Sequence, residues 1–211
     1  SSDIILGLQW LDEIGCDIIN VSIGSMLRRY DALSAACDSL ARKGRIVCIA
    51  AGNDGPLTIT SPANAYGGIT CAACDQNGHH SGFSSIGPAL GMDREELAKP
   101  DVMAWGEHCA LCRARGSYMG LPIHDMYVAA DGTSFATPFV AGLSALYKEV
   151  KGDLSAFITD ITANCEDNVD YTHHQEGFGI ATIGFLRKDG DPPVGPPITP
   201  PTGGCLLAGI S

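Results

Sequence analysis

The run at positions 132–138, Gly-Thr-Ser-Phe-Ala-Thr-Pro, is the clearest chemical signal in the sequence, because it puts a serine where a helix is expected to begin. Backbone N–H groups are unpaired at the start of a helix and the helix dipole is positive there, so such a place can stabilise an oxyanion. Ser134 is therefore a candidate nucleophile. The alternative is an ordinary N-cap serine, which stabilises the helix and performs no chemistry.

Positions 51–55, Ala-Gly-Asn-Asp-Gly, give a second signal, since they follow an apolar run at 46–50 that suits a buried strand. A side chain at the carboxyl end of a parallel strand points into the crevice where such sheets bind ligands, so the Asn53 amide could donate a hydrogen bond there. The alternative is an asparagine in a glycine-rich turn. The presence of the first motif favours a site shared by Asn53 and Ser134.

An α/β domain with a mostly parallel sheet is expected to position these two residues. Apolar residues recur at helical spacing in four segments and form short continuous runs in four others. The expected helices are 3–14, 31–43, 134–151 and 154–164, and the expected strands are 17–21, 46–50, 68–73 and 101–105. Strand, helix and strand follow one another within about thirty residues, as in a βαβ unit. Continuous apolar strands indicate a sheet that is covered on both faces.

The remaining segments divide the chain into a domain and a tail. The helix 134–151 is expected to bury one apolar face, formed by Phe139, Val140, Leu143, Leu146 and Tyr147. The stretches 75–99 and 106–130 are expected to be irregular, because glycine, proline, asparagine and serine punctuate them. We expect a domain over 1–186, a proline- and glycine-rich linker over 187–204 and an apolar tail over 205–211. The tail is expected to pack on a partner or near the site; the alternative is a tail that makes no contact.

Charge and composition exclude two classes of partner. The 24 Asp and Glu against 13 Lys and Arg give a net charge of −11, whereas phosphate binding needs clustered Lys and Arg, so nucleic acid is excluded as the main partner. With 45% hydrophobic and 18% charged residues, the chain can bury a core. It has neither an apolar run long enough to span a membrane nor a signal peptide at its start. We therefore expect no membrane partner and a cytoplasmic location, with secretion left open.

The nine cysteines lie mostly where alanine or valine would serve, so they are expected to be buried, reduced thiols. The alternative is a zinc site built from two C-x-x-C pairs, Cys71 with Cys74 and Cys109 with Cys112. Both pairs fall in strand-like runs, where residues three apart point to opposite faces. No acidic loop has convincing calcium-ligand spacing either. The sequence therefore predicts no metal and no cofactor.

Taken together, the motifs resemble those of the subtilisin-like serine proteases, the subtilase family. The run 132–138 is similar to the family's nucleophile motif, and 50–55 is similar to the motif of its oxyanion asparagine. Further segments resemble family segments in the family's order: 17–24 the substrate-binding strand, 61–63 the cis-proline segment, and then 83–88, 99–104 and 177–180. The resemblance covers roughly residues 3–186. It implies a three-layer subtilisin-like fold in which this chain supplies the later strands and helices.

The resemblance also implies roles for individual residues in peptide-bond hydrolysis. Ser134 would be the nucleophile, and Asn53 would form the oxyanion hole with the Ser134 N–H. A peptide or protein substrate would bind through a further set of residues. In that set, Ser22, Ile23 and Gly24 would pair with the substrate backbone, and Ala50, Ala51, Gly52 and Thr133 would line its binding site.

A subtilase triad runs Asp, His, Ser along the chain, and only the last member is found here. Both other motifs would lie before the residue equivalent to Ser1, and none of the six histidines has a spacing that suggests a base for Ser134. Three explanations stay open. An N-terminal fragment chain carrying Asp and His could remain associated, the chain could be an inactive fragment, or it could be a noncatalytic peptide-binding module.

Overall fold

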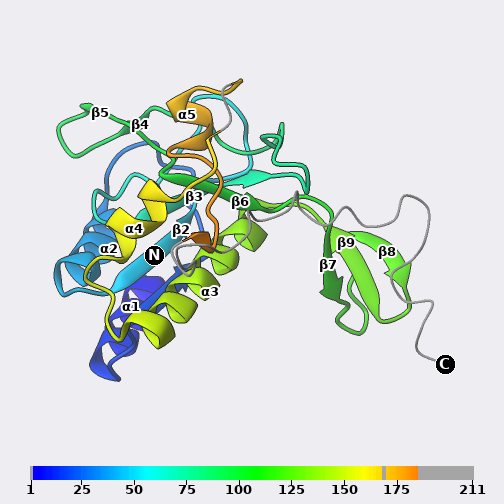
Figure 1. The fold of residues 1–211 in the computed structure, drawn as a ribbon, viewed down its shortest axis with the longest axis horizontal. Helices are drawn as coiled ribbons and strands as arrows, with labels where there is room; N and C mark the ends of the chain where they lie inside the picture. Colours follow the sequence, from blue (N-terminus) through cyan, green and yellow to red (C-terminus); the bar gives the residue numbers. More distant parts are fainter. Residues whose placement is uncertain (1, 168–169, 185–211) are drawn as a thin grey trace, which may run out of the picture.

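The computed structural model describes residues 2–167 and 170–184, and its centre is a four-stranded parallel sheet (Figure 1). Its strands are β1 (Ile18–Val21), β2 (Ile46–Ala50), β3 (Ile69–Cys74) and β6 (Val102–Trp105), in the order β1-β2-β3-β6. All residues of β2 and β3 are buried. This confirms the prediction from continuous apolar runs, since a parallel sheet covered on both faces needs strands that are apolar on both sides.

Helices cover both faces of this sheet, which gives the three layers that the sequence predicts. One face packs on α1 (Ser2–Glu13) and α2 (Ala32–Arg42), and the other on α3 (Thr133–Lys151) and α4 (Phe157–Ala163). Alternate residues of β2 divide between the two layers. Ile46 and Cys48 belong to the cluster under α3, whereas Val47 and Ile49 belong to the cluster under α1 and α2. A short helix, α5 (His173–Glu176), follows.

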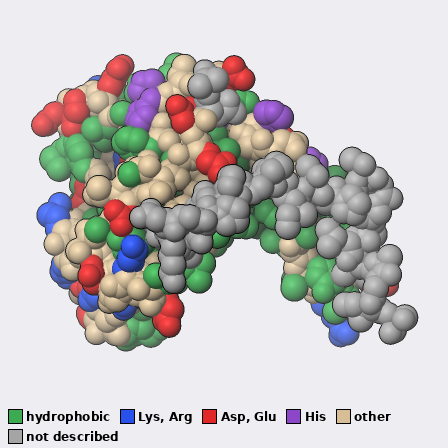
Figure 2. Space-filling view, in the orientation of Figure 1, with side chains coloured by type: hydrophobic (Ala, Val, Ile, Leu, Met, Phe, Trp, Pro, Cys, Tyr) green, Lys and Arg blue, Asp and Glu red, His purple; other side chains and the backbone are tan. Residues whose placement is uncertain are grey.

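The expected irregular stretch 106–130 is instead partly folded into a second sheet, and that prediction was wrong. Three antiparallel strands form it in the order β7-β9-β8, with the bounds β7 (Cys109–Cys112), β8 (Leu121–His124) and β9 (Tyr127–Ala130). The strands have only four residues each, too few for alternation to be recognised among glycines and polar residues. This sheet stands apart from the main body (Figures 1 and 2). In the loop-rich stretch 75–99, a two-stranded ladder joins β4 (Ala89–Leu90) to β5 (Glu96–Leu97).

One predicted helix face is buried only in part. Val140, Leu143 and Tyr147 of α3 are buried, but Phe139 and Leu146 are each 49% exposed. The expected helix over 154–164 is also shorter than predicted, since α4 begins at Phe157. The linker 187–204 and the tail 205–211 lie outside the described residues, so those boundaries stay predictions. Within the described residues, no helix is long and apolar enough to cross a membrane.

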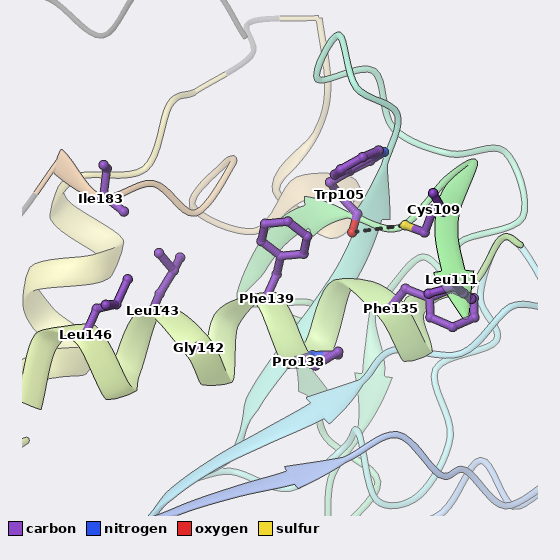
Figure 3. Close-up of a pocket in the computed structure, with 11 residues that line it drawn as sticks. Trp105, Cys109, Leu111, Phe135, Pro138, Phe139, Gly142, Leu143, Leu146 and Ile183 are labelled. Carbon is purple, nitrogen blue, oxygen red and sulfur yellow. Dashed lines mark hydrogen bonds between the residues drawn. The ribbon is translucent and has the colours of Figure 1, made fainter. Parts of the chain in front are cut away.

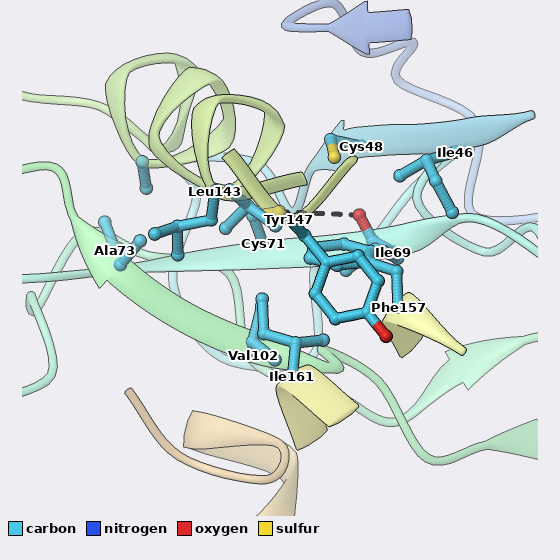
Figure 4. Packing of buried hydrophobic residues seen from close by; sticks show 13 residues of the cluster. Ile46, Cys48, Ile69, Cys71, Ala73, Val102, Leu143, Tyr147, Phe157 and Ile161 are labelled. Carbon is cyan, nitrogen blue, oxygen red and sulfur yellow. Dashed lines mark hydrogen bonds between the residues drawn. The ribbon is translucent and has the colours of Figure 1, made fainter. Parts of the chain in front are cut away.

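Cysteine thiols take the place of aliphatic side chains in the core (Figure 4). Cys48 and Cys71 lie beneath α3 with Tyr147 and Phe157, and Cys37 lies in the opposite layer. Burial raises the pKa of Cys48 and of Cys37 to about 12, so both thiols are protonated at neutral pH. Within the C-x-x-C pair of β3, Cys71 faces α3 and Cys74 packs with Met103 in another cluster. The two side chains thus point to opposite faces of the strand, as the strand prediction requires.

Alkylation by iodoacetamide should therefore distinguish the cysteines of the native chain. Cys112, which is exposed, should react quickly at pH 8, whereas Cys37, Cys48 and Cys71 should react only after the chain unfolds. Mass spectrometry of digests taken over time, with and without denaturant, measures the modification at each site. Equal labelling of Cys48 and Cys112 under native conditions would contradict this packing.

Candidate active site

The carboxyl ends of three strands meet the amino-terminal end of α3, where Ser134 lies. From β1, the Ser22 Oγ donates a hydrogen bond of 3.0 Å to the Ser134 carbonyl. From β2, the residues that follow the strand contact Thr133. After β6, the Gly132 N–H donates to the Gly106 carbonyl at 2.8 Å. The position of the candidate nucleophile is thus fixed from three sides by the sheet.

Pro138 explains the contact from β1. In an α-helix the N–H of residue 138 would donate to the carbonyl of residue 134, but proline has no N–H. The Ser134 carbonyl is therefore left without its helical partner, and the Ser22 hydroxyl supplies a replacement donor. The proline of the 132–138 motif and the serine after β1 form one hydrogen-bonding unit.

Asn53 is held by its amide oxygen. This oxygen accepts hydrogen bonds from the Thr133 N–H at 2.9 Å and from the Thr133 Oγ1 at 3.0 Å. The Thr133 Oγ1 also lies 3.2 Å from the Gly52 N–H, so the turn after β2 is joined to the start of α3 at two residues. Because the oxygen is used in this way, the Asn53 Nδ2 group remains as a donor at the same place.

Two glycines allow close packing around the turns that follow β2 and β6. Gly52 has a φ of +111°, and a Cβ there would lie 2.7 Å from the Ser85 Oγ. At Gly106 a Cβ would lie 2.8 Å from both the Gly132 carbonyl oxygen and the Ala73 Cβ. A side chain at Gly106 would push the end of β6 away from the start of α3, and one at Gly52 would displace Ser85 from the turn after β2.

Ser134 is partly buried, and its hydroxyl and N–H groups are unpaired within the described part of the chain. Neither its Oγ nor its backbone N–H makes a hydrogen bond to a described residue, and Gly132 before the helix gives no side-chain cap. The two donors available here are the Ser134 N–H at the start of α3 and the Nδ2 group of Asn53, whose amide oxygen is held by Thr133. An oxyanion hole requires donors of this kind.

The predicted substrate-binding residues lie around this centre. Gly52 and Thr133 contact each other, and Ser22 contacts Ser134. Ile23 is 47% exposed, and Gly24 is also exposed. Ala50 and Ala51 are buried at the end of β2. The structure therefore brings these residues to one edge of the sheet, and their roles toward a substrate stay predictions.

The histidines whose side chains are described have other neighbours. Burial lowers the pKa of His80, whose ring lies 6.0 Å from that of Tyr171. His79 contacts Asp75, His108 contacts Glu107 and Asp131, His173 packs on Phe178, and the His174 carbonyl accepts from Gly87. None of these described side chains hydrogen-bonds to Ser134, so a general base is not found among them.

Sequence reasoning missed a hollow of about 250 Å³ between Phe135 at the start of α3 and the small sheet. Phe135, Asp131 and His108 line it together with Met119 and Leu121. The His108 N–H donates to the Asp131 carboxylate at 2.6 Å, which fixes the loop before β7 against the end of β9. No signal could have found this hollow, because the segment that builds it was expected to be irregular.

Comparisons with known proteins identify the family of the chain. The model of the peptidase S8 family, described as the subtilase family, matches residues 1–175. The serine protease AprX of Bacillus subtilis is 33% identical over 180 residues, which cover 73% of this chain and 40% of AprX. Subtilisin BL of Lederbergia lenta is 32% identical over 70% of this chain and 48% of its own length. The chain thus spans less than half the length of these two relatives.

Solved structures show the same fold. The patellamide maturation protease PatA is 25% identical with a TM-score of 0.68, over 86% of this chain and 65% of that one. The prenylagaramide maturation protease PagA is 24% identical with a TM-score of 0.69, over 86% of this chain and 64% of that one. The predicted family resemblance and the subtilisin-like α/β fold are confirmed.

The unit formed by Ser22 and Pro138 can be tested by a double-mutant cycle. Ser22→Ala should lower the free energy of unfolding by about 0.5–1.5 kcal/mol, because the Ser134 carbonyl loses its donor. In a Pro138→Ala background the same change should cost less, since residue 138 then has an N–H that can donate to that carbonyl. Urea unfolding of the four proteins measures both costs. Equal costs in the two backgrounds would show that Ser22 acts in some other way.

Proposed function

Because the chain belongs to the subtilase family, we propose that it is the nucleophile-bearing part of a serine endopeptidase, with Ser134 attacking the carbonyl carbon of a peptide bond. The observation that carries this proposal is the pair of hydrogen bonds from Thr133 to the Asn53 amide oxygen. They leave the Asn53 Nδ2 and the Ser134 N–H as donors for the oxygen that becomes negative in the transition state. An asparagine in an ordinary turn would not need such a connection.

The proposed reaction follows the two steps of covalent catalysis. The Ser134 Oγ adds to the carbonyl while its proton passes to a histidine, and the oxyanion is stabilised by Asn53 and the Ser134 N–H. The histidine then protonates the leaving amine as the peptide bond breaks. Water attacks the resulting ester by the same route in reverse, which releases the acid product and restores the Ser134 hydroxyl.

The histidine and the aspartate that orients it are proposed to come from a segment that precedes the described fold. Two observations support this. The Ser134 Oγ makes no hydrogen bond within residues 2–167 and 170–184, and β1 pairs with only one described strand. A further parallel strand beside β1 would end at the edge where Ser22 contacts Ser134, so side chains that follow it would lie close to the nucleophile.

The substrate is proposed to be a peptide or protein segment that binds in an extended conformation. Residues Ser22, Ile23 and Gly24 follow the carboxyl end of β1, so a substrate strand could pair with them beyond the end of the sheet. Ala50, Ala51, Gly52 and Thr133 are proposed to form the pocket for the side chain before the scissile bond. The alternative function is an inactive subtilase-like fragment or peptide-binding module.

Replacing the nucleophile separates these functions. In the protein assembled with its Asp- and His-bearing segment, Ser134→Ala should lower peptide hydrolysis about a million-fold, the loss known for the serine of subtilisin. Binding of an uncleaved peptide should persist. Ser155→Ala, at an exposed serine between α3 and α4, should leave turnover unchanged. Equal activity of Ser134→Ala and the unmodified protein would refute the assignment, and binding without turnover in the unmodified protein would favour the peptide-binding module.

The acceptor role and the donor role of the Asn53 side chain can be tested separately. Asn53→Asp keeps an oxygen for Thr133 but loses the N–H₂ donor, whereas Asn53→Ala loses both. Both variants should lower turnover by about a hundred- to a thousandfold with little change in KM, as removal of the oxyanion asparagine does in subtilisin. Only Asn53→Ala should remove the link to α3. Steady-state kinetics and thermal unfolding measure the two effects, and near-normal turnover of Asn53→Asp would exclude the donor role.

A further inference from the structure

An apolar groove of about 1000 Å³ runs along the outer side of α3 (Figure 3). The floor is formed by three residues of α3: Phe135, Phe139 and Leu146. Trp105 and Leu111 form a wall near Phe135, and Ile183 lies at the end near Leu146. The Trp105 ring tilts against that of Phe139 with centroids 5.9 Å apart. Every residue that lines the groove is uncharged, so it suits an apolar occupant.

Two of the floor residues, Phe139 and Leu146, belong to the face of α3 that the sequence predicts to be buried. Phe139 and Leu146 are seven residues apart and share one helix face, as expected for a packed stripe. Each is nevertheless 49% exposed, and no described element covers them. Two large apolar side chains that are half exposed on one helix face, within a groove, indicate a binding surface for an apolar group.

We propose that the apolar segment 205–210 of this same chain occupies the groove. The described chain reaches the groove at Ile183, which lines it, and the residues that follow Gly184 in the sequence are the candidates for its occupant. Among those residues, 187–191 are mostly charged and 192–201 are rich in proline. Segment 205–210, Cys-Leu-Leu-Ala-Gly-Ile, is the longest uncharged apolar run after Ile183 that contains no proline.

The dimensions agree with this occupant. The floor from Phe135 to Leu146 spans eleven helical steps, about 16 Å at 1.5 Å per residue. Six residues in an extended conformation span about 20 Å. The proline-rich stretch can extend about 3.1 Å per residue, so the tether reaches both ends of the groove. Tethering also gives the segment an effective concentration in the millimolar range, which compensates for a small contact area.

The groove would be occupied as far as the first turn of α3, since Phe135 lines it. The segment would therefore lie next to the hollow that Phe135 shares with Asp131 and His108. Occupation of the groove is independent of the proposed hydrolysis, so it can be tested on the chain whether or not Ser134 is catalytic.

The fluorescence of Trp105 reports whether the groove is occupied, because Trp105 lines the groove and is one of only two tryptophans in the sequence. The other, Trp10, lies exposed on α1 in the opposite layer and can be replaced by phenylalanine. In the Trp10→Phe chain, Trp105 should emit at shorter wavelength than in the same chain ended after Lys188. A synthetic peptide of residues 203–211, added to the shortened chain, should restore the shorter wavelength in a saturable manner.

A matched pair of variants makes the test specific. Leu146→Glu should abolish the effect of the peptide, whereas Leu6→Glu, at a leucine that is 61% exposed on α1, should leave it intact. Identical emission of the full and shortened chains, together with no response to the peptide, would overturn the proposal. A second result would also overturn the proposal: the emission wavelength of the shortened chain shifts with protein concentration, and native mass spectrometry shows a dimer. The groove would then be an interface between two copies of the chain.

Discussion

The hydrogen bonds between the Asn53 amide oxygen and Thr133 are the interaction on which the site depends. They join the end of a central strand to the start of the helix that carries Ser134, with donor-to-acceptor distances of 2.9 and 3.0 Å. A neutral hydrogen bond of this kind is worth only about 1 kcal/mol, so its importance lies in orientation. It decides which end of the amide faces Thr133 and therefore which end is free to donate.

The rest of the fold keeps this contact in place. Buried strands β2 and β3 carry apolar residues on both faces, and α3 packs across the whole sheet through Val140, Leu143 and Tyr147. Close approach of the end of β6 to α3 then needs glycine at 106, where a Cβ would collide with the Gly132 carbonyl oxygen, and glycine at 52 leaves room for Ser85. Pro138 removes one helical hydrogen bond, and Ser22 replaces it from β1. Packing thus brings the elements together, and a few polar contacts set their register.

The sheet, its helices and the placement of Asn53 and Ser134 at the same end of the sheet could be predicted from the sequence because each has a local signal. Continuous apolar runs mark β2 and β3, and glycine-rich turns mark the ends of strands. The small sheet could not be predicted, since its four-residue strands are stabilised by pairing with one another rather than by a local pattern. The exposure of Phe139 and Leu146 could not be predicted either. Periodicity shows which residues share a helix face, but it does not show whether another element covers that face. The contact between Ser22 and Ser134 depends on tertiary structure alone.

The central claim is that Asn53 and the Ser134 N–H form an oxyanion hole, and a crystal structure with a bound peptide boronic acid tests it most directly. The boron atom is expected on the Ser134 Oγ, with one boronate oxygen about 2.7–3.1 Å from both the Asn53 Nδ2 and the Ser134 N, and with the Thr133 contacts to Asn53 intact. A boronate oxygen that points to solvent, or an Asn53 side chain that has turned away from Thr133, would contradict the claim.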